Sequence, residues 1–190
     1  MRVQSSWAVL AFTAFASLAV NAQPLDQRDL IERLTHCTAS LQDVMVFNGL
    51  VERKELTLTA ASEFEPWGGL AWTIEPALSF GNVSSSVAVM SDHRSFYLRV
   101  PSTQPGVDIR TTAQQLQLAN TGSGGEANDF RKVMDDRTLQ AMSTGEPDNY
   151  WVGCFYDQDA VQRQFDLELN TTPERMNEKN ARQQALGNES

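Results

Sequence analysis

The sequence predicts an α+β fold: an N-terminal amphipathic helix packed on an antiparallel β-meander sheet, a second short helix, a C-terminal hairpin and strand, and a polar helical tail. Three observations lead to this prediction. Apolar residues near the N-terminus recur every three or four positions, those in the middle of the chain alternate with polar residues, and short polar segments separate the alternating runs. Consecutive strands with short turns between them pair antiparallel, so a meander is expected.

The first predicted helix covers residues 26–48. Asp26 is a suitable N-cap, because its carboxylate can accept hydrogen bonds from the free N–H groups of the first turn, and Gly49 is a suitable stop. The apolar face consists of residues at helical spacing: Leu30, Leu34, Cys37, Leu41 and Val44. Cys37 is therefore expected on the buried side of the helix, which disfavours an exposed catalytic thiol.

The next predicted elements are strands. Residues 55–64 and 70–80 alternate apolar with polar side chains, and the sequence Pro-Trp-Gly-Gly at 66–69 predicts a turn between them. Two further strands are expected at residues 87–90 and 96–100, joined by the polar turn 91–95. These four runs form the predicted meander.

The second half of the chain begins with a predicted short helix over residues 107–119, with Asp108 as its cap, and a loop at 120–129. Residues 130–143 predict a hairpin around the turn pair Asp135 and Asp136, and residues 149–156, NYWVGCFY, form the most strongly β-like segment. Residues 161–169 predict one more strand or a helical turn. Thr172 and Pro173 then predict the start of a polar, peripheral helix.

The N-terminus has the pattern of a secretory signal peptide. Arg2 precedes an apolar stretch at residues 7–20, and a small-residue exit ends at Ala22. A membrane span needs roughly 20 apolar residues, so this stretch is too short to be one. We expect a signal peptide at residues 1–22, a single α+β domain at 23–169 and a polar C-terminal tail at 170–190. The protein is thus predicted to be periplasmic or secreted, with no membrane span after cleavage.

Export determines the expected chemistry of the two cysteines. Cys37 and Cys154 would enter an oxidising compartment together, where paired thiols tend to form a disulfide. A reactive thiolate would need a base and an electropositive setting. The sequence therefore predicts a structural disulfide between Cys37 and Cys154.

The charge of the chain limits its partners. It has 15 basic and 24 acidic residues and a net charge of −9. Nucleic acids and anionic membranes both require clustered basic residues, so neither is expected as a partner. A cationic protein partner is compatible with this charge.

Motifs for catalysis and metal binding are absent from the sequence. It contains no G-x-S-x-G, S-x-x-K or HExxH motif, and His36 and His93 are its only histidines. The run GSGGEA at 122–127 superficially matches a dinucleotide fingerprint but lacks the flanking βαβ unit. We therefore predict no catalytic residue, no metal site and no cofactor, although carboxylates such as Asp135 and Asp136 leave a glycosidase-like hydrolase open.

Trp67 is the candidate partner contact. It lies at a predicted turn tip beside Pro and Gly and close to Glu63 and Glu65, where a core position is less natural than for the other aromatic residues. An aromatic anchor on an acidic loop is a suitable contact for a basic protein. Three sequons, at Asn82, Asn170 and Asn188, matter only in a eukaryotic host.

The sequence favours an exported soluble binding protein over an enzyme. The most specific form of this hypothesis is an inhibitor or immunity-type protein that neutralises a cationic cell-envelope toxin or hydrolase by protein–protein contact. Two alternatives stay open: a carboxylate-dependent envelope hydrolase, and a carrier of a small apolar ligand on the open face of the sheet.

Overall fold

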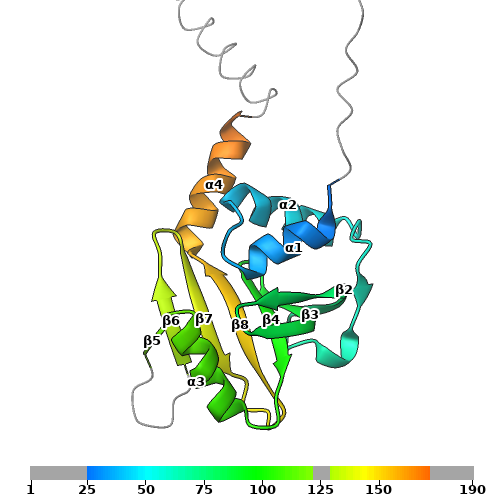
Figure 1. The fold of residues 1–190 in the computed structure, drawn as a ribbon. Coiled ribbons are helices and arrows are strands. Elements are labelled where there is room, and N and C mark those ends of the chain that lie inside the picture. Colours follow the sequence, from blue (N-terminus) through cyan, green and yellow to red (C-terminus); the bar gives the residue numbers. More distant parts are fainter. Residues whose placement is uncertain (1–24, 122–128, 172–190) are drawn as a thin grey trace, which may run out of the picture.

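The computed structural model describes residues 25–121 and 129–171, and within these ranges it confirms an α+β fold (Figure 1). The helices are α1 (Gln27–Thr35), α2 (Leu41–Glu52), α3 (Pro105–Gln115), α4 (Gln158–Thr171) and the short 3-10 helix η1 (Ser62–Phe64). The strands are β1 (Thr59–Ala60), β2 (Leu70–Phe80), β3 (Val83–Asp92), β4 (Ser95–Pro101), β5 (Ala119–Asn120), β6 (Asp129–Val133), β7 (Arg137–Ser143) and β8 (Asn149–Tyr156).

All eight of these strands belong to one antiparallel sheet with the order β1-β2-β3-β4-β8-β7-β6-β5. The sheet is two meanders joined side by side, because α3 connects β4 to β5 and the last strand, β8, returns to pair with β4. Tyr97 of β4 lies opposite Gly153 of β8 at this junction. A side chain at Gly153 would meet the carbonyl oxygen of Phe96 at 2.2 Å, so glycine is needed where the two meanders meet.

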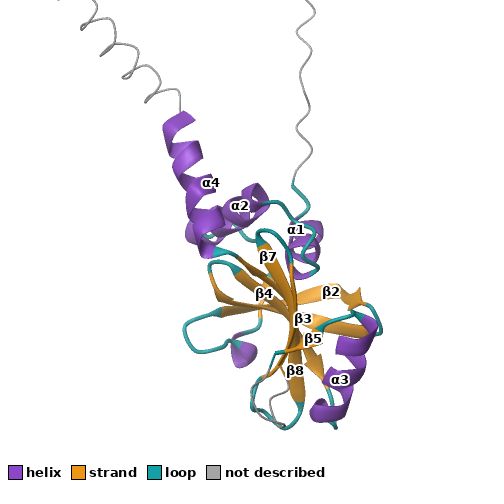
Figure 2. Cartoon of the chain, turned by 90° about the vertical axis from the view of Figure 1, so that its left-hand side faces the viewer, coloured by secondary structure: helices purple, strands orange, loops and turns teal. Residues whose placement is uncertain are grey.

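Within the described residues, the buried side chains of α1, α2 and α3 lie on one face of the sheet, and Ala61 and Phe64 pack on the other. Figure 2 shows α1 and α3 on the same side of the sheet. Their buried residues, including Leu30 and Ile109, share one core with Leu98 and Val152 from the central strands. Side chains alternate along a strand, so the neighbours of these core residues point to the opposite face, which we call the open face.

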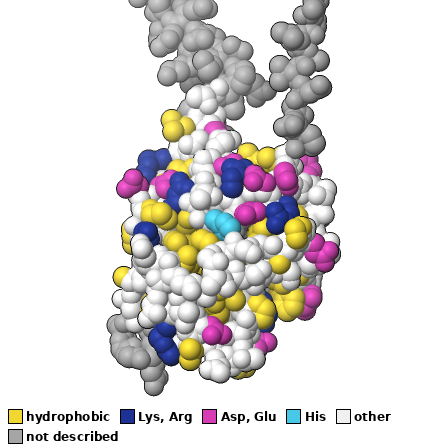
Figure 3. Space-filling view, viewed as in Figure 1, with side chains coloured by type: hydrophobic (Ala, Val, Ile, Leu, Met, Phe, Trp, Pro, Cys, Tyr) yellow, Lys and Arg dark blue, Asp and Glu magenta, His cyan; other side chains and the backbone are white. Residues whose placement is uncertain are grey.

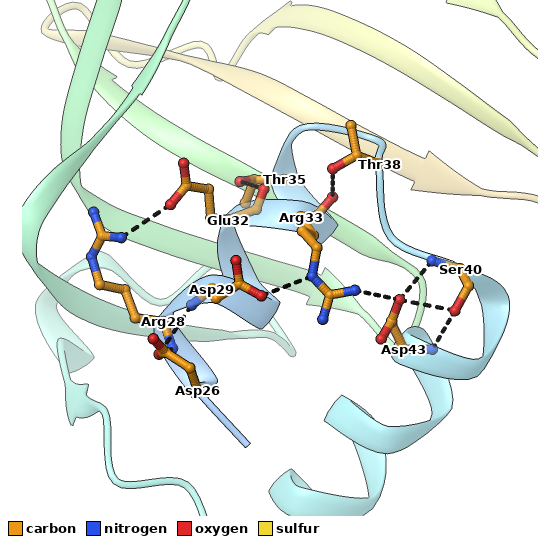
Figure 4. A network of polar contacts seen from close by, with 9 residues as sticks. All are labelled: Asp26, Arg28, Asp29, Glu32, Arg33, Thr35, Thr38, Ser40 and Asp43. Atoms are coloured by element: carbon orange, nitrogen blue, oxygen red, sulfur yellow. Dashed lines mark hydrogen bonds and ion pairs between the residues drawn. The ribbon is translucent and has the colours of Figure 1, made fainter. Parts of the chain in front are cut away.

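The long first helix is in fact two helices, so the prediction of one helix over residues 26–48 is wrong at its centre. α1 ends at Thr35, and Ser40 starts α2 with a capping box in which Ser40 and Asp43 exchange hydrogen bonds (Figure 4). Cys37 lies between the helices with φ +59°, outside any helical face. The predicted stop at Gly49 is also wrong, because Gly49 lies inside α2.

An ion pair stabilises the bend between the two helices. Arg33 at the end of α1 contacts Asp43 at 2.7 Å and Asp29 at 3.0 Å, so one guanidinium joins both helices (Figure 4). Burial raises the pKa of Asp43, but the hydrogen bonds from Ser40, and after them the contact with Arg33, outweigh this effect and lower the pKa below its usual value. The apolar spacing continues through the bend, which explains why the sequence pattern resembles one helix.

Other predicted elements need smaller corrections. Of the strand expected at 55–64, only Thr59–Ala60 forms, because the chain then leaves the sheet edge and crosses the open face. Asp108 is not the cap of α3. The helix begins at Pro105, and the Asp108 carboxylate accepts a 2.5 Å hydrogen bond from the Ser102 hydroxyl. Residues 161–169 belong to α4, and the predicted signal peptide, residues 122–127 and the tail from 172 lie outside the described ranges.

The predicted disulfide is confirmed. Cys37 and Cys154 are bonded across a sequence separation of 117 residues. The bond attaches the segment between α1 and α2 to β8, one of the two central strands. The layer of N-terminal helices is thus covalently joined to the sheet that it covers.

Candidate functional site

The most exposed large apolar side chain in the described part of the chain is Trp67, with a relative exposure of 103%. It lies in the segment of residues 61–69, which we call the Trp67 loop. The amide of Gly69 donates a 2.9 Å hydrogen bond to the carbonyl of Pro66 and closes a turn, in which Gly68 has a φ of +76°. Gly68 suits this turn because L side chains rarely adopt that conformation. The turn therefore presents the indole to solvent.

The Trp67 loop is anchored to the open face. The amide of Ala61 donates a 2.9 Å hydrogen bond to the carbonyl of Ala71, and Ala61 is buried in a small cluster with Ala71 and Val89. Phe64 packs against the same cluster, and the guanidinium of Arg99 lies 4.7 Å from the centre of its ring. Contacts of this kind, rather than Trp67 itself, hold the loop in place.

The far end of the loop is also constrained. A Cβ atom on Gly69 would lie 2.3 Å from the carbonyl oxygen of Met90 and 2.6 Å from Pro66 Cγ. Only glycine allows the turn to approach β3 so closely. Both ends of the loop are therefore fixed against the sheet, while the tip that carries Trp67 is not covered.

The structure places all three predicted contact residues in this loop. Glu63 and Glu65 are exposed on either side of Phe64. Further carboxylates lie near Arg99, whose Nη2 is 3.4 Å from Glu146 and 3.3 Å from Asp148. A hydrogen bond from the Asn149 side chain, and then the charge of Arg99, lower the pKa of Asp148.

The surface on the helical side of the sheet carries charges of both signs. Figure 3 shows acidic and basic side chains interspersed there, without a continuous basic stripe.

Aromatic residues continue across the open face from the Trp67 loop. Tyr97 and Trp151 stack with ring centres 5.4 Å apart, and Arg94 lies 4.5 Å from the centre of the Phe155 ring. Gln140 donates a 2.5 Å hydrogen bond to the Tyr97 hydroxyl, and burial raises the pKa of Tyr97 to about 12. Trp151 and Phe155 alternate with apolar neighbours in the sequence, as core residues would, but they are half-buried on this open face and do not belong to the main core.

The two histidines make contacts within the fold. His36 stacks on Phe80 with ring centres 4.4 Å apart, its Nε2 is buried without a hydrogen-bond partner, and burial lowers its pKa. His93 lies in the turn between β3 and β4, where its carbonyl oxygen accepts a 2.7 Å hydrogen bond from Asn48.

Asp135 and Asp136 do not form a pair of free carboxylates. Asp136 accepts two hydrogen bonds from Arg137, at 2.7 and 2.9 Å, and these lower its pKa. In the described ranges, no cluster of three or more His, Cys, Asp or Glu side chains has the geometry of a metal site.

A groove between α2 and α4 was not predicted from the sequence. Its walls come from Met45, Gly49 and Glu52 of α2, Val161 and Phe165 of α4, and His93 of the β3–β4 turn, and its volume is about 430 Å³. The spacing of Val161 and Phe165, four residues apart, was the available signal for an apolar helix face. Their meeting with α2 depends on where β8 ends, which sequence patterns do not determine.

Over residues 25–121 and 129–171, none of the helices combines the length and apolar character needed to cross a membrane. The chain matches no protein-family model, no curated protein and no solved structure.

Proposed function

We propose that this chain is an exported binding protein of the inhibitor or immunity type, which neutralises a cationic envelope-acting toxin or hydrolase through the Trp67 loop. The observation that carries the proposal is the complete exposure of Trp67 on a loop anchored at both ends. A tryptophan at this position contributes little to the fold. Its burial against a partner would contribute about 4 to 6 kcal/mol, from an area of 150 to 250 Å² at about 25 cal/mol per Å².

Anchoring favours binding because less conformational entropy is lost on association. Ala61, Phe64 and Gly69 already hold the loop in one arrangement, so a partner need not order it. Glu63 and Glu65 stand beside the anchor and suit a partner with Lys or Arg side chains. Such charges mainly raise the association rate, while the buried aromatic residue lowers the dissociation rate.

The test is binding to exported toxins and hydrolases encoded beside this gene, measured by biolayer interferometry with three variants. Trp67→Ala should weaken binding by about 100-fold, as for an interface hot spot, and leave the melting temperature unchanged. The double variant Glu63→Gln, Glu65→Gln should mainly slow association and reduce its salt dependence. Val133→Ala, which trims another exposed apolar residue, is the matched control.

Three results would argue against this function. Binding that is unaffected by Trp67→Ala would place the contact elsewhere. A large loss of stability in that variant would make Trp67 a structural residue. Hydrolysis of peptidoglycan or lipid by the purified protein, lost on one carboxylate-to-amide change, would favour the carboxylate-dependent hydrolase instead.

A further inference from the structure

We propose that the open face of the sheet binds a neutral saccharide, in a pocket that lies over β4, β8, β7 and β6. The volume of this pocket is about 310 Å³. It lies at the lower end of the range of about 300 to 1,000 Å³ typical of small-molecule sites, so it has room for one sugar ring. This proposal goes beyond the proposed function and does not rest on it.

The strand register places the lining of the pocket in two neighbouring rows that each cross the four strands. The first row consists of residues paired directly across β4, β8, β7 and β6: Ser95, Phe155, Thr138 and Val133. The second row crosses the same strands two residues further along: Tyr97, Gly153, Gln140 and Arg131. Directly paired residues present their side chains on the same face, so polar and aromatic groups converge here. We call this site the Gln140 pocket.

The polar groups of the Gln140 pocket are held in fixed positions. The ring of Tyr97 lies over Gly153, and Gln140 Nε2 donates a 2.5 Å hydrogen bond to the Tyr97 hydroxyl. Trp151 stacks on the same ring, with the ring centres 5.4 Å apart. Burial raises the pKa of Tyr97 to about 12, so its hydroxyl stays neutral and protonated at physiological pH. A ligand therefore meets groups that need no ordering on binding.

The two arginines beside the Gln140 pocket already have anionic partners. Asp129 accepts hydrogen bonds from Nε and Nη2 of Arg131, at 3.2 and 2.6 Å. Nε of Arg94 lies 4.0 Å from Asp92. These charges cancel in pairs, so the pocket offers no excess of positive charge to an anionic ligand. A guanidinium has five N–H donors, and Arg131 can therefore also donate to a neutral acceptor.

The hydroxyl and amide groups of the lining favour a polyhydroxylated ligand over an apolar one. An apolar molecule would displace water from Thr138 and Gln140 without replacing its hydrogen bonds, and such a loss is unfavourable. Sugar hydroxyls both donate and accept hydrogen bonds. They can therefore pair with hydroxyl, amide and guanidinium groups alike.

Phe155 supplies the aromatic wall that a sugar ring requires. The faces of an aromatic ring carry partial negative charge, which attracts the weakly positive C–H groups of a sugar. Phe155 is paired directly with Thr138 across β8 and β7, so the aromatic ring and a hydroxyl lie side by side. Arg94 lies 4.5 Å from the centre of the Phe155 ring and helps to fix it. One ring can thus stack and form hydrogen bonds at once.

The experiment is saturation-transfer difference NMR of the purified protein with three neutral saccharides, N-acetylchitotriose, cellotriose and maltotriose. Octanoate and N-acetylglycinamide are the anionic apolar and the peptide-like comparison compounds. At least one saccharide should bind with a Kd of about 0.1 to 10 mM, since the pocket is small and contacts a single ring. The two comparison compounds should bind more weakly than that saccharide.

Two variants assign the binding to the Gln140 pocket. Thr138→Val keeps the β-branched shape and removes the hydroxyl, so the Kd should rise about 2- to 10-fold. Phe155→Ala removes the aromatic wall, and the Kd should rise at least about tenfold. Val107→Ala, which trims an exposed residue of α3 on the helical side, is the matched control and should bind like the wild type. Thermal unfolding of each variant checks the fold, and Thr138→Val decides the test if Phe155→Ala is destabilised.

Four results would overturn the proposal. One is the absence of binding by all three saccharides at 10 times the weakest expected Kd, or about 100 mM. Another is saccharide binding that Thr138→Val leaves unchanged. Tighter binding of octanoate would identify an apolar or anionic ligand, and tighter binding of N-acetylglycinamide would identify a peptide. Because these titrations contain no partner protein, their failure leaves partner binding at Trp67 to be decided by its own assay.

Discussion

The guanidinium carbon of Arg99 lies 4.7 Å from the centre of the Phe64 ring and connects the Trp67 loop to β4. The same side chain reaches Glu146 and Asp148 before β8, so Arg99 holds two segments of the chain together. Phe64 is three residues from Trp67. The direction in which the indole points thus depends on a contact that Trp67 does not make.

Replacing Phe64 with alanine should loosen the Trp67 loop. The variant loses a cation–π contact and part of its packing on Ala71 and Val89, together about 1 to 2 kcal/mol. Hydrogen exchange at the amide of Gly69 should become faster, since that amide closes the turn. Trp67→Ala, in the same loop, should leave this exchange rate unchanged. Equal protection in Phe64→Ala would show that Phe64 does not anchor the loop.

Removing the disulfide should lower the free energy of unfolding substantially. For a loop closed across 117 residues, the chain-entropy estimate is about 4 to 5 kcal/mol. The double variant Cys37→Ala, Cys154→Ala should therefore unfold at much lower urea concentration than the wild type. Mass analysis of the wild type before and after reduction provides the control for bond formation. An unchanged urea midpoint would mean that the noncovalent contacts of α1 and α2 suffice.

Stability should decrease as the pH falls below about 6.5, because of His36. Burial lowers the folded-state pKa of His36 despite the opposing charge of Glu32, so the unfolded chain binds its proton more readily. The contribution of neutral His36 to the free energy of unfolding is fully present above the pKa that His36 has in the unfolded chain. It is lost as the pH drops toward the lower pKa of His36 in the folded protein. Urea unfolding between about pH 5 and 8 measures this loss.

His36→Phe is the matched variant for this pH effect. Phenylalanine can keep the stack on Phe80 and does not titrate. The free energy of unfolding should therefore change less with pH over this range than in the wild type. The lowered pKa values of Asp43 and Asp136 act only at more acidic pH, at about 4 and below, where their ion pairs are lost. A slope that persists in His36→Phe would assign the effect to another group.

Arg137→Lys should destabilise the fold by about 2 to 3 kcal/mol, since lysine cannot reproduce the planar fork of arginine. From β7, Arg137 donates to the carbonyls of Cys37 and Ala39, and it also pairs with Asp136. Arg131→Lys is the control. Its partner Asp129 is on the sheet periphery, and such a pair contributes less than about 1 kcal/mol. If Arg137→Lys and Arg131→Lys had equal midpoints in thermal unfolding, the stabilising role of the Arg137 contacts would be contradicted.

Several features of the fold could be predicted from residues that are close in sequence. The strands around Ala88, Leu98 and Val152 were recognisable because one face of each is buried in the core, and burial imposes a period of two. The division between α1 and α2 was not. Its cause is the capping box of Ser40 and Asp43, which was hidden because the apolar spacing continues past it.

The candidate site was predictable only in part. The turn residues Pro66 and Gly68 marked Trp67 as a tip residue, and the structure places it fully exposed. The residues that anchor the loop, Ala71, Val89 and Arg99, belong to other strands, so no local sequence pattern could predict these contacts.

By itself, the sequence determined the α+β class, the position of most strands and the pairing of Cys37 with Cys154, because these follow from local periodicity and from the presence of only two cysteines. Tertiary structure alone decided that β8 lies beside β4, that the Trp67 loop crosses the open face and that α4 meets α2 in a groove. The physical reason is that these arrangements depend on contacts between segments far apart in the chain. Such contacts form only when the sheet brings these segments together.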